Sequence, residues 1–361
     1  MGRVQLHEHA GSGSEDAVLR LIREEGPLPA PGDAAWDSCA RQLVAEGLAG
    51  TALTLLDRSG HKSDLPASAR ETLERELARV RVSQALLFHR FEALAGELRT
   101  AGVEVIAHKG GALAPLLYPR IEDRPMVDID VIFRPREWRR VRDTVVSRGY
   151  RLPAGAHEEF WLENYFNLCV VSPQTPPTSF DLHWSLTQEG RYRIETEDLF
   201  ARAVPYDFGD ARLLRLSNED MLLSLFLHLA YHYFEAHLIW LYDMKLVIER
   251  WEIDWEVLLI RAREWGLMTV VAFNFAFLEK IFPGLVPAGV ADRARPAALR
   301  RLLARPLLSG SPRHLFRGED VRFNQFVLGL LAIDRPADAG RFAADKVGRS
   351  LRWLGRRPRR R

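Results

Sequence analysis

Cysteine and lysine are scarce in this chain, and the sequence shows neither the pattern of a signal peptide nor that of a transmembrane helix. Only two of the 361 residues are cysteine, and only five of the 50 basic residues are lysine. Two cysteines without paired spacing exclude a disulfide framework and favour a reducing, cytoplasmic setting. The first 14 residues lack the apolar core of a signal peptide. Since no apolar run reaches the roughly 20 residues of a transmembrane helix, we expect neither secretion nor a membrane span.

The charges nearly balance, but they are unevenly distributed. The chain carries 50 basic and 48 acidic side chains, and seven arginines without an acid lie in residues 349–361. Without those seven charges, the net charge of +2 becomes −5. A dedicated nucleic-acid-binding protein normally has a basic face on its folded part, so nucleic acid is not an expected partner. The excess of arginine over lysine is typical of a GC-rich bacterial genome, and the basic tail is interpreted as a solvated terminus.

The spacing of apolar residues predicts helical ends and a mixed centre. Apolar residues recur at helical spacing in the N-terminal third and again after Ser217, and short β-branched runs lie between. We therefore predict an α+β fold, a small mixed β-sheet core flanked by N- and C-terminal helical domains. The expected segments are a disordered N-terminus (1–14), an N-terminal helical domain (15–102), an α/β core (103–216), a C-terminal helical domain (217–345) and a basic tail (346–361).

Turn residues and caps divide the core into elements. Gly102 is a suitable C-cap for the last N-terminal helix, and Ser217 with Asp220 resembles a capping box for the first C-terminal one. A helix is expected after Pro135. The predicted strands are 103–107, 167–171, 179–184 and a pair within 204–216 that turns at Asp207–Asp210.

Residues 108–133 carry the pattern that specifies chemistry. Gly110 and Gly111 form a turn that opens a short helix, and Asp128 and Asp130 follow on a strand. Successive strand residues point to opposite faces, so the two aspartates share a face. Converging carboxylates repel each other and usually need a cation, and oxygen-only ligands favour Mg²⁺ or Mn²⁺ over zinc. The pattern thus predicts a site for Mg²⁺ and a nucleoside triphosphate.

This order of motifs resembles the nucleotidyltransferases of the DNA polymerase β superfamily. More narrowly, it is similar to an uncharacterised bacterial nucleotidyltransferase family with helical flanks. The superfamily pattern is a strand that ends in a glycine turn, two acids separated by one apolar residue, and a third carboxylate on a later strand. The matching positions are Gly110, Gly111, Asp128, Asp130 and Asp181. The resemblance covers residues from about 35 to 300.

The resemblance implies that the glycine turn binds the β- and γ-phosphates. Backbone N–H groups of Gly110 and Gly111 can donate to phosphate oxygens, because glycine allows close approach and a helix N-terminus favours negative charge. Lys109 and Arg124 are the cations expected to offset the triphosphate. The superfamily often has a serine near Gly111 where this chain has Ala112, so hydroxyl contacts are not expected.

The resemblance also implies a two-metal site. Asp128 and Asp130 are expected to hold the metal of the nucleotide, and with Asp181 a second ion that activates the acceptor hydroxyl. Asp181 is also a candidate general base. The expected cofactor is Mg²⁺, with two ions, and Mn²⁺ is an alternative.

The implied reaction is transfer of a nucleoside monophosphate, with AMP from ATP favoured, and release of pyrophosphate. The favoured acceptor is a hydroxyl or phosphate of a small molecule or a peptide natural product. One alternative is nucleotidylation of a protein partner, in the manner of antitoxin-type enzymes. Another is a nucleotide-binding or interaction module that has lost turnover.

Other polar residues have both a functional and a structural interpretation. Asp243 is a further candidate nucleotide-binding residue, although an acid that pairs with another helix is equally compatible with the pattern. His183 can form a simple structural pair with Asp181. His228 and His232 are spaced for zinc, but without the glutamate of a metalloprotease motif they are better interpreted as histidines that line a cleft.

Four aromatic residues before the third predicted strand have two interpretations as well. They can stack on a base or an acceptor ring, whereas core packing is the default for such a cluster. These residues are Phe160, Trp161, Tyr165 and Phe166.

Overall fold

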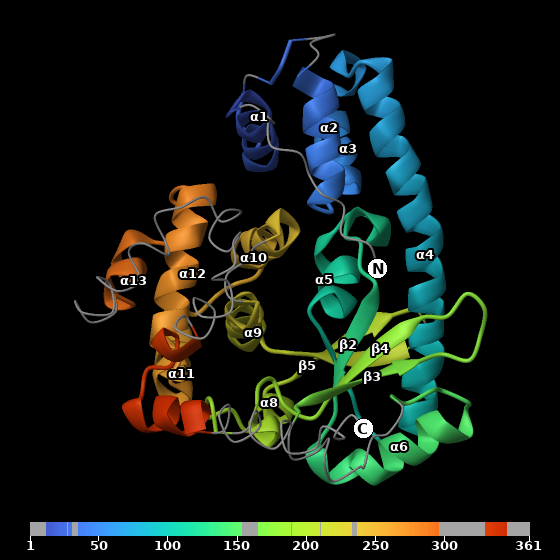
Figure 1. Cartoon of the computed structure of the whole chain (residues 1–361), viewed down its shortest axis with the longest axis vertical. Coiled ribbons are helices and arrows are strands. Elements are labelled where there is room, and N and C mark those ends of the chain that lie inside the picture. Colours follow the sequence, from blue (N-terminus) through green and yellow to red (C-terminus); the bar gives the residue numbers. More distant parts are fainter. Residues whose placement is uncertain are drawn as a thin grey trace, which may run out of the picture.

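The computed structural model of the chain contains one six-stranded sheet between two groups of helices (Figure 1). It describes residues 12–26, 28–30, 35–153, 165–188, 190–209, 211–232, 237–295 and 329–344. Phe160, Trp161 and the basic tail lie outside these ranges. The sheet is mixed, and helices precede and follow it in the sequence. This confirms the predicted α+β class.

The N-terminal group consists of helices that pack on one another and against the sheet. These are α1 (Ser12–Arg23), α2 (Ala35–Ala45), α3 (Ala49–Arg58), the 3₁₀ turn η1 (Lys62–Asp64) and the long α4 (Ala67–Thr100). α1 begins within the segment expected to be disordered, because a serine-rich start followed by Glu15 suits a helix N-terminus. α4 ends as predicted: Gly102 has φ +74°, and the N–H of Val103 donates to Leu98 O at 2.9 Å.

The sheet has the strand order β3-β4-β2-β1-β6-β5. The strands are β1 (Ile106–His108), β2 (Asp128–Ile132), β3 (Asn167–Val171), β4 (Ser179–His183), β5 (Val204–Phe208) and β6 (Ala211–Arg215). β2 and β4 run parallel, as do β1 and β6, and the other neighbours are antiparallel. The prediction of a strand at 103–107 was wrong in its bounds, because Val103 still closes α4 and pairing with β2 starts only at Ile106.

In the part of the chain that the structure describes, three of the connections between strands contain short helical elements. They are α5 (Gly110–Leu117), η2 (Ile121–Asp123), η3 (Pro135–Glu137), α6 (Trp138–Ser147) and α8 (Thr196–Ala201). α5 and η2 occupy the link between β1 and β2, and the glycine turn, where α5 begins, follows directly on the end of β1. The hairpin of β5 and β6 confirms the strand pair predicted within 204–216.

The two faces of the sheet differ in character because apolar and acidic residues alternate along β2 and β4. Ile129 and Phe180 are fully buried on one face. α4 covers this face, and the ring centroid of Phe91 lies 6.5 Å from that of Phe180. The aspartates stand at the alternate positions of the same strands and so point away from α4. The pattern that builds the core thereby gathers the carboxylates on the opposite face.

The C-terminal group begins where β6 ends. Its helices include α9 (Asn218–Tyr231), α10 (Leu238–Arg250), α11 (Trp255–Trp265), α12 (Met268–Ile281) and α13 (Ala288–Arg293), and residues 336–344 are helical as well. Ser217 is the N-cap of α9 and accepts from the N–H of Asp220 at 3.2 Å. The Asp220 carboxylate pairs with Arg202 and Arg261, so only half of the predicted capping box forms. Among the described residues, no helix has both the length and the apolar character to span a bilayer.

Candidate active site

The turn between β1 and α5 is tightly constrained. Lys109 has φ +47° and ψ −130°, an uncommon backbone conformation for a residue with a side chain. A Cβ at Gly111 would lie 2.7 Å from Cγ2 of Ile129, and one at Gly110 would lie 2.8 Å from Nη1 of Arg124. A side chain at Gly111 would force the β-branched Ile129 to shift, and one at Gly110 would displace the ends of the Arg124 and Met126 side chains. The N–H groups of Ala112 and Leu113 donate to the carbonyl oxygen of Lys109, and those of Gly110 and Gly111, the first two of the helix, have no acceptor within it.

The strand register brings the predicted carboxylates together. In the parallel pair of β2 and β4, Asp130 stands directly beside Asp181. Asp128 is two residues before Asp130 and shares its face. Ligand atoms of Asp130, Asp181 and His183 all lie within 4.8 Å of one another. The sequence assigned Asp128, Asp130 and Asp181 to the metal. Among the described residues, this group of ligand atoms contains His183 and does not contain Asp128.

Asp130 is the centre of a small polar network. Its Oδ1 lies 2.8 Å from Nζ of Lys109 and 2.9 Å from Nε2 of His183. Asn167 on β3 donates from Nδ2 to Oδ2 of Asp181 at 3.0 Å. Lys109, predicted as a phosphate-binding cation, thus sits at the carboxylates as well as at the glycine turn.

The electrostatics separate the two aspartates of β2. Burial and the neighbouring charges of Asp130 and Asp181 raise the pKa of Asp128 to about 6. Burial also acts to raise the pKa of Asp130, but Lys109 and His183 outweigh it and hold that pKa well below its ordinary value. Like charges gathered on a half-buried face are costly unless a cation neutralises them. The arrangement is suited to binding a positive ion.

Arg124 and Asp243 form an ion pair with each other, and the charge of Arg124 also acts to lower the pKa of Asp128. Nη2 of Arg124 lies 2.7 Å from Oδ2 of Asp243, and the hydroxyl of Tyr118 donates to Oδ1 of Asp243 at 2.7 Å. The Asp243 side chain is fully buried. This ion pair joins α10 to the segment after α5. The guanidinium of Arg124 also packs closely against Gly110, so it supports the glycine turn.

An aromatic patch at the end of α9 and the start of α10 adjoins the cluster. The ring of His228 lies 4.6 Å from that of His232 and 4.5 Å from that of Trp240. The pKa of His228 is held well below its ordinary value, mainly by burial and to a lesser extent by the positive charge of Lys109. Among the described residues, neither histidine belongs to a group of three side chains able to hold a metal. Their interpretation as cleft histidines stays a prediction.

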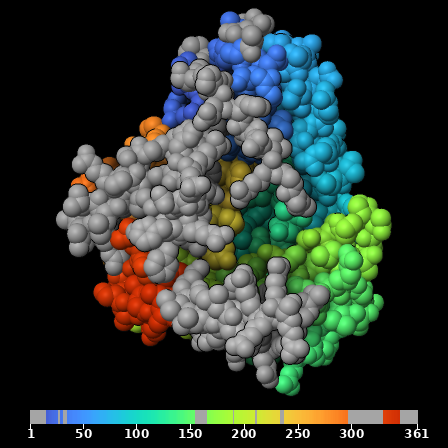
Figure 2. All heavy atoms as spheres, in the orientation of Figure 1, coloured from blue at the N-terminus to red at the C-terminus, as the bar shows by residue number. Residues whose placement is uncertain are grey.

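Two of the four predicted aromatic residues lie in the described part of the chain. Phe166 packs with a centroid distance of 5.8 Å from His183 and 5.4 Å from Tyr231. It therefore connects the acidic cluster to the aromatic patch. Tyr165 is exposed beside it. Figure 2 shows the surface receding where the yellow of α9 and α10 meets the green of the sheet and α5.

Three residues near the carboxylates were not assigned a role in the predicted site. His108 pairs with Asp130 across β1 and β2, Asn167 bonds to Asp181, and His183 bonds to Asp130. His108 immediately precedes Lys109 and His183 follows Asp181 by two, so strand alternation was an available signal for His183. No local signal identifies Asn167, because its place depends on how β3 pairs with β4.

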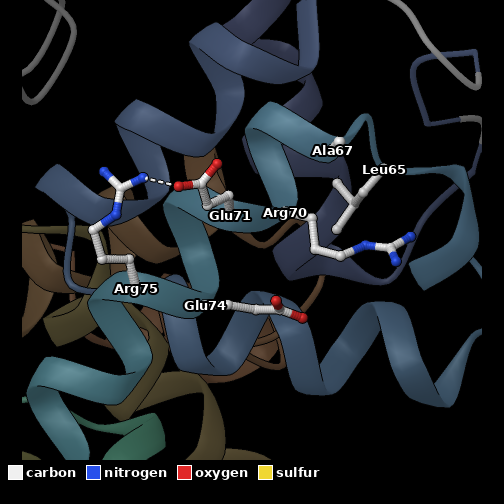
Figure 3. Close-up of a pocket in the computed structure, with 6 residues that line it drawn as sticks. All are labelled: Leu65, Ala67, Arg70, Glu71, Glu74 and Arg75. Atoms are coloured by element: carbon white, nitrogen blue, oxygen red, sulfur yellow. Dashed lines mark hydrogen bonds and ion pairs between the residues drawn. The ribbon is translucent and has the colours of Figure 1, made fainter.

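A surface depression on the first turns of α4 carries no comparable chemistry. It is lined by Leu65, Ala67, Arg70, Glu71, Glu74 and Arg75 (Figure 3). Arg75 and Glu71 form an exposed ion pair at 2.6 Å, and such pairs are common on helix surfaces. The candidate site is therefore the carboxylate face and not this depression.

The family model described as "Uncharacterised nucleotidyltransferase" matches residues 32–283, which is 252 of the 361 residues. The chain belongs to this nucleotidyltransferase family. The matched range includes the glycine turn, all three predicted carboxylates and α9 and α10. No curated protein matches the chain. The family assignment confirms the predicted resemblance.

Proposed function

We propose that the protein transfers a nucleoside monophosphate, AMP from ATP, to a hydroxyl or phosphate of a small molecule or peptide natural product, with Mg²⁺ as cofactor. One observation carries the proposal: the parallel register of β2 and β4 puts Asp130 beside Asp181, on the face that also holds Asp128. This face adjoins the Gly110 turn through the contact of Lys109 with Asp130. We propose residues 103–216 as the catalytic core between the two helical domains.

The residues fit a divalent ion. The raised pKa of Asp128 arises from burial and from two neighbouring carboxylates, which is the environment that a cation relieves. Asp128, Asp130 and Asp181 would hold the metal, with two ions favoured. When bound, the metal would neutralise phosphate charge and lower the pKa of the acceptor hydroxyl.

The glycine turn supplies the complementary half of the site. The N–H groups of Gly110 and Gly111 would donate to the β- and γ-phosphates at the start of α5. Lys109 would move from Asp130 toward the triphosphate as the metal takes over the charge of the carboxylate. Arg124 would support the turn from its buried pair with Asp243, and Asp243 would act on the nucleotide through Arg124.

Asp181 would act on the acceptor. Its Oδ2 accepts from Asn167, which orients the carboxylate, so we assign the other oxygen, Oδ1, to the acceptor. That oxygen would accept the proton of the attacking hydroxyl, and pyrophosphate would leave from the opposite side of the α-phosphorus.

The cysteines Cys39 and Cys169 are both free, which supports the proposed cytoplasmic location.

The test measures pyrophosphate release from labelled ATP with a panel of hydroxyl and phosphate acceptors and Mg²⁺. Asp128→Ala and Asp130→Ala should lower the rate by at least about a thousandfold, as expected when charge stabilisation at the reacting phosphate is lost. Asp143→Asn, at an exposed aspartate of α6, is the matched control and should keep the full rate. Full activity in the Asp130 variant would refute the proposed site.

Two further measurements on the same protein identify the class of acceptor. Intact masses of proteins that co-purify with the enzyme would show an added nucleotide if the acceptor is a protein partner. Tight ATP binding without pyrophosphate release over the whole panel would instead indicate a binding module. Either result would overturn the proposed small-molecule acceptor.

A further inference from the structure

His183 lies on the metal-facing side of β4 although it was not expected to bind metal. It follows Asp181 by two residues, so both side chains point to the same face. The His183 side chain is only 4% exposed. Its ring is held between two others, at centroid distances of 5.8 Å from Phe166 and 6.1 Å from His108. The imidazole is therefore oriented before any ion binds.

Nε2 of His183 is directed at the carboxylates. It lies 2.9 Å from Oδ1 of Asp130, and the ligand atoms of His183, Asp130 and Asp181 are within 4.8 Å of one another. Ligands on opposite sides of an ion bound at about 2.1 Å are about 4.2 Å apart. Shifts of a few tenths of an ångström would thus close these three ligands on one ion.

The protonation of the ring permits direct ligation. Nδ1 of His183 is buried and has no hydrogen-bond partner in the described part of the structure, whereas Nε2 donates to the carboxylate of Asp130 and so carries the proton while no ion is bound. An ion at Asp130 would displace this proton, and Nδ1 can carry it instead. With the proton on Nδ1, Nε2 presents its lone pair to the cluster. Oδ1 of Asp130 currently faces both Lys109 and His183, and an ion between Asp130 and His183 would replace these two contacts.

We infer that His183 binds the divalent ion directly through Nε2, and that this nitrogen makes the site prefer Mn²⁺ to Mg²⁺. The inference rests on the proposed function, because it concerns the same ion. Oxygen ligands serve Mg²⁺ and Mn²⁺ about equally well, whereas imidazole selects for transition metals. One imidazole with two or three carboxylates suits Mn²⁺, which accepts both kinds of ligand.

The direct test is pulsed electron paramagnetic resonance of Mn²⁺ bound to the wild-type protein. A directly bound imidazole nitrogen gives a ¹⁴N modulation of the electron spin echo. Labelling only the histidines with ¹⁵N should convert this signal to that of ¹⁵N, which excludes nitrogen from the backbone or from a nucleotide. This experiment needs no variant and so does not depend on one that folds.

Variants then assign the nitrogen to one residue. His183→Gln offers an oxygen at a similar distance from the backbone, and should remove the histidine modulation while Mn²⁺ still binds. The matched control is His232→Gln, whose ring belongs to the aromatic patch and should leave the modulation unchanged. Competition of Mg²⁺ against Mn²⁺ should show a preference for Mn²⁺ that falls about tenfold in His183→Gln and not in the control.

The outcomes separate this inference from the proposed function. Stoichiometric Mn²⁺ binding without histidine modulation would overturn the inference alone, and so would an unchanged preference in His183→Gln. Failure of both Mn²⁺ and Mg²⁺ to bind would overturn the proposed metal-dependent function together with the inference.

Discussion

Replacing Asp128 by asparagine should stabilise the metal-free protein, although it destroys the proposed site. Burial and the charges of Asp130 and Asp181 raise the pKa of Asp128 from its ordinary value of 3.8 to about 6. A raised pKa means that the folded state binds the proton more tightly than the unfolded state. Ionisation of Asp128 therefore lowers the free energy of unfolding as the pH rises from about 4 to 6, and the loss stays constant above that window.

The size of the effect follows from the shift in pKa. At 1.36 kcal/mol for each pKa unit, the destabilisation amounts to about 3 kcal/mol at neutral pH. Asparagine has a similar shape and does not ionise, so Asp128→Asn should match the wild type near pH 4 and exceed it by up to about 3 kcal/mol above pH 6. Mg²⁺ at a hundred times its dissociation constant should stabilise the wild type by about 2.7 kcal/mol and the variant far less.

The assay is urea denaturation followed by circular dichroism, over pH 4 to 8, with Mg²⁺ or with a chelator. Asp143→Asn serves as a control for the loss of one exposed carboxylate. The reasoning would be refuted if Asp128→Asn were no more stable than the wild type above pH 6, or if Mg²⁺ stabilised both proteins equally.

Three further predictions concern the residues around the carboxylates. Gly111→Ala should destabilise the protein by about 1–3 kcal/mol in thermal denaturation, because the new Cβ would meet Ile129 at 2.7 Å; in a double-mutant cycle, Gly111→Ala should cost less in an Ile129→Ala background than in the wild type, and a wild-type Tm in the single variant would contradict this packing. Asp243→Asn should cost about 3–5 kcal/mol in urea denaturation, since it leaves the buried Arg124 without its ion-pair partner; a loss under 1 kcal/mol would show that the pair is dispensable. Lys109→Met should weaken ATP binding by calorimetry at least about tenfold, and unchanged affinity would remove Lys109 from the phosphate site.

Local patterns in the sequence were sufficient for much of the fold. Alternation of acidic and apolar residues identified β2 and its polar face, and glycine and serine marked the end of α4 and the start of α9. The β5–β6 hairpin followed from two short runs with a turn between them. These features depend on residues within a few positions of one another, which is why local propensity and periodicity report them.

Pairing between distant segments determines which residues meet at the candidate site, and local patterns do not predict it. The partner of Asp130 on β4 is set by the parallel register, and the bond from His183 to Asp130 joins residues 53 positions apart. Arg124 and Asp243 are separated by 119 positions, so two residues interpreted as separate nucleotide-binding candidates proved to be one buried pair. Asn167 entered the site only because β3 lies beside β4. Such partners follow from the packing of the whole sheet and not from any short segment.

Calorimetry with a non-hydrolysable ATP analogue tests most directly whether the carboxylates and the glycine turn form one site for a metal-bound triphosphate. The analogue should bind the wild-type protein in Mg²⁺, lose most of its affinity when the metal is chelated, and fail to show this metal dependence in Asp130→Asn. Equal affinity with and without the metal, or an Asp130→Asn variant that responds to Mg²⁺ like the wild type, would contradict the site.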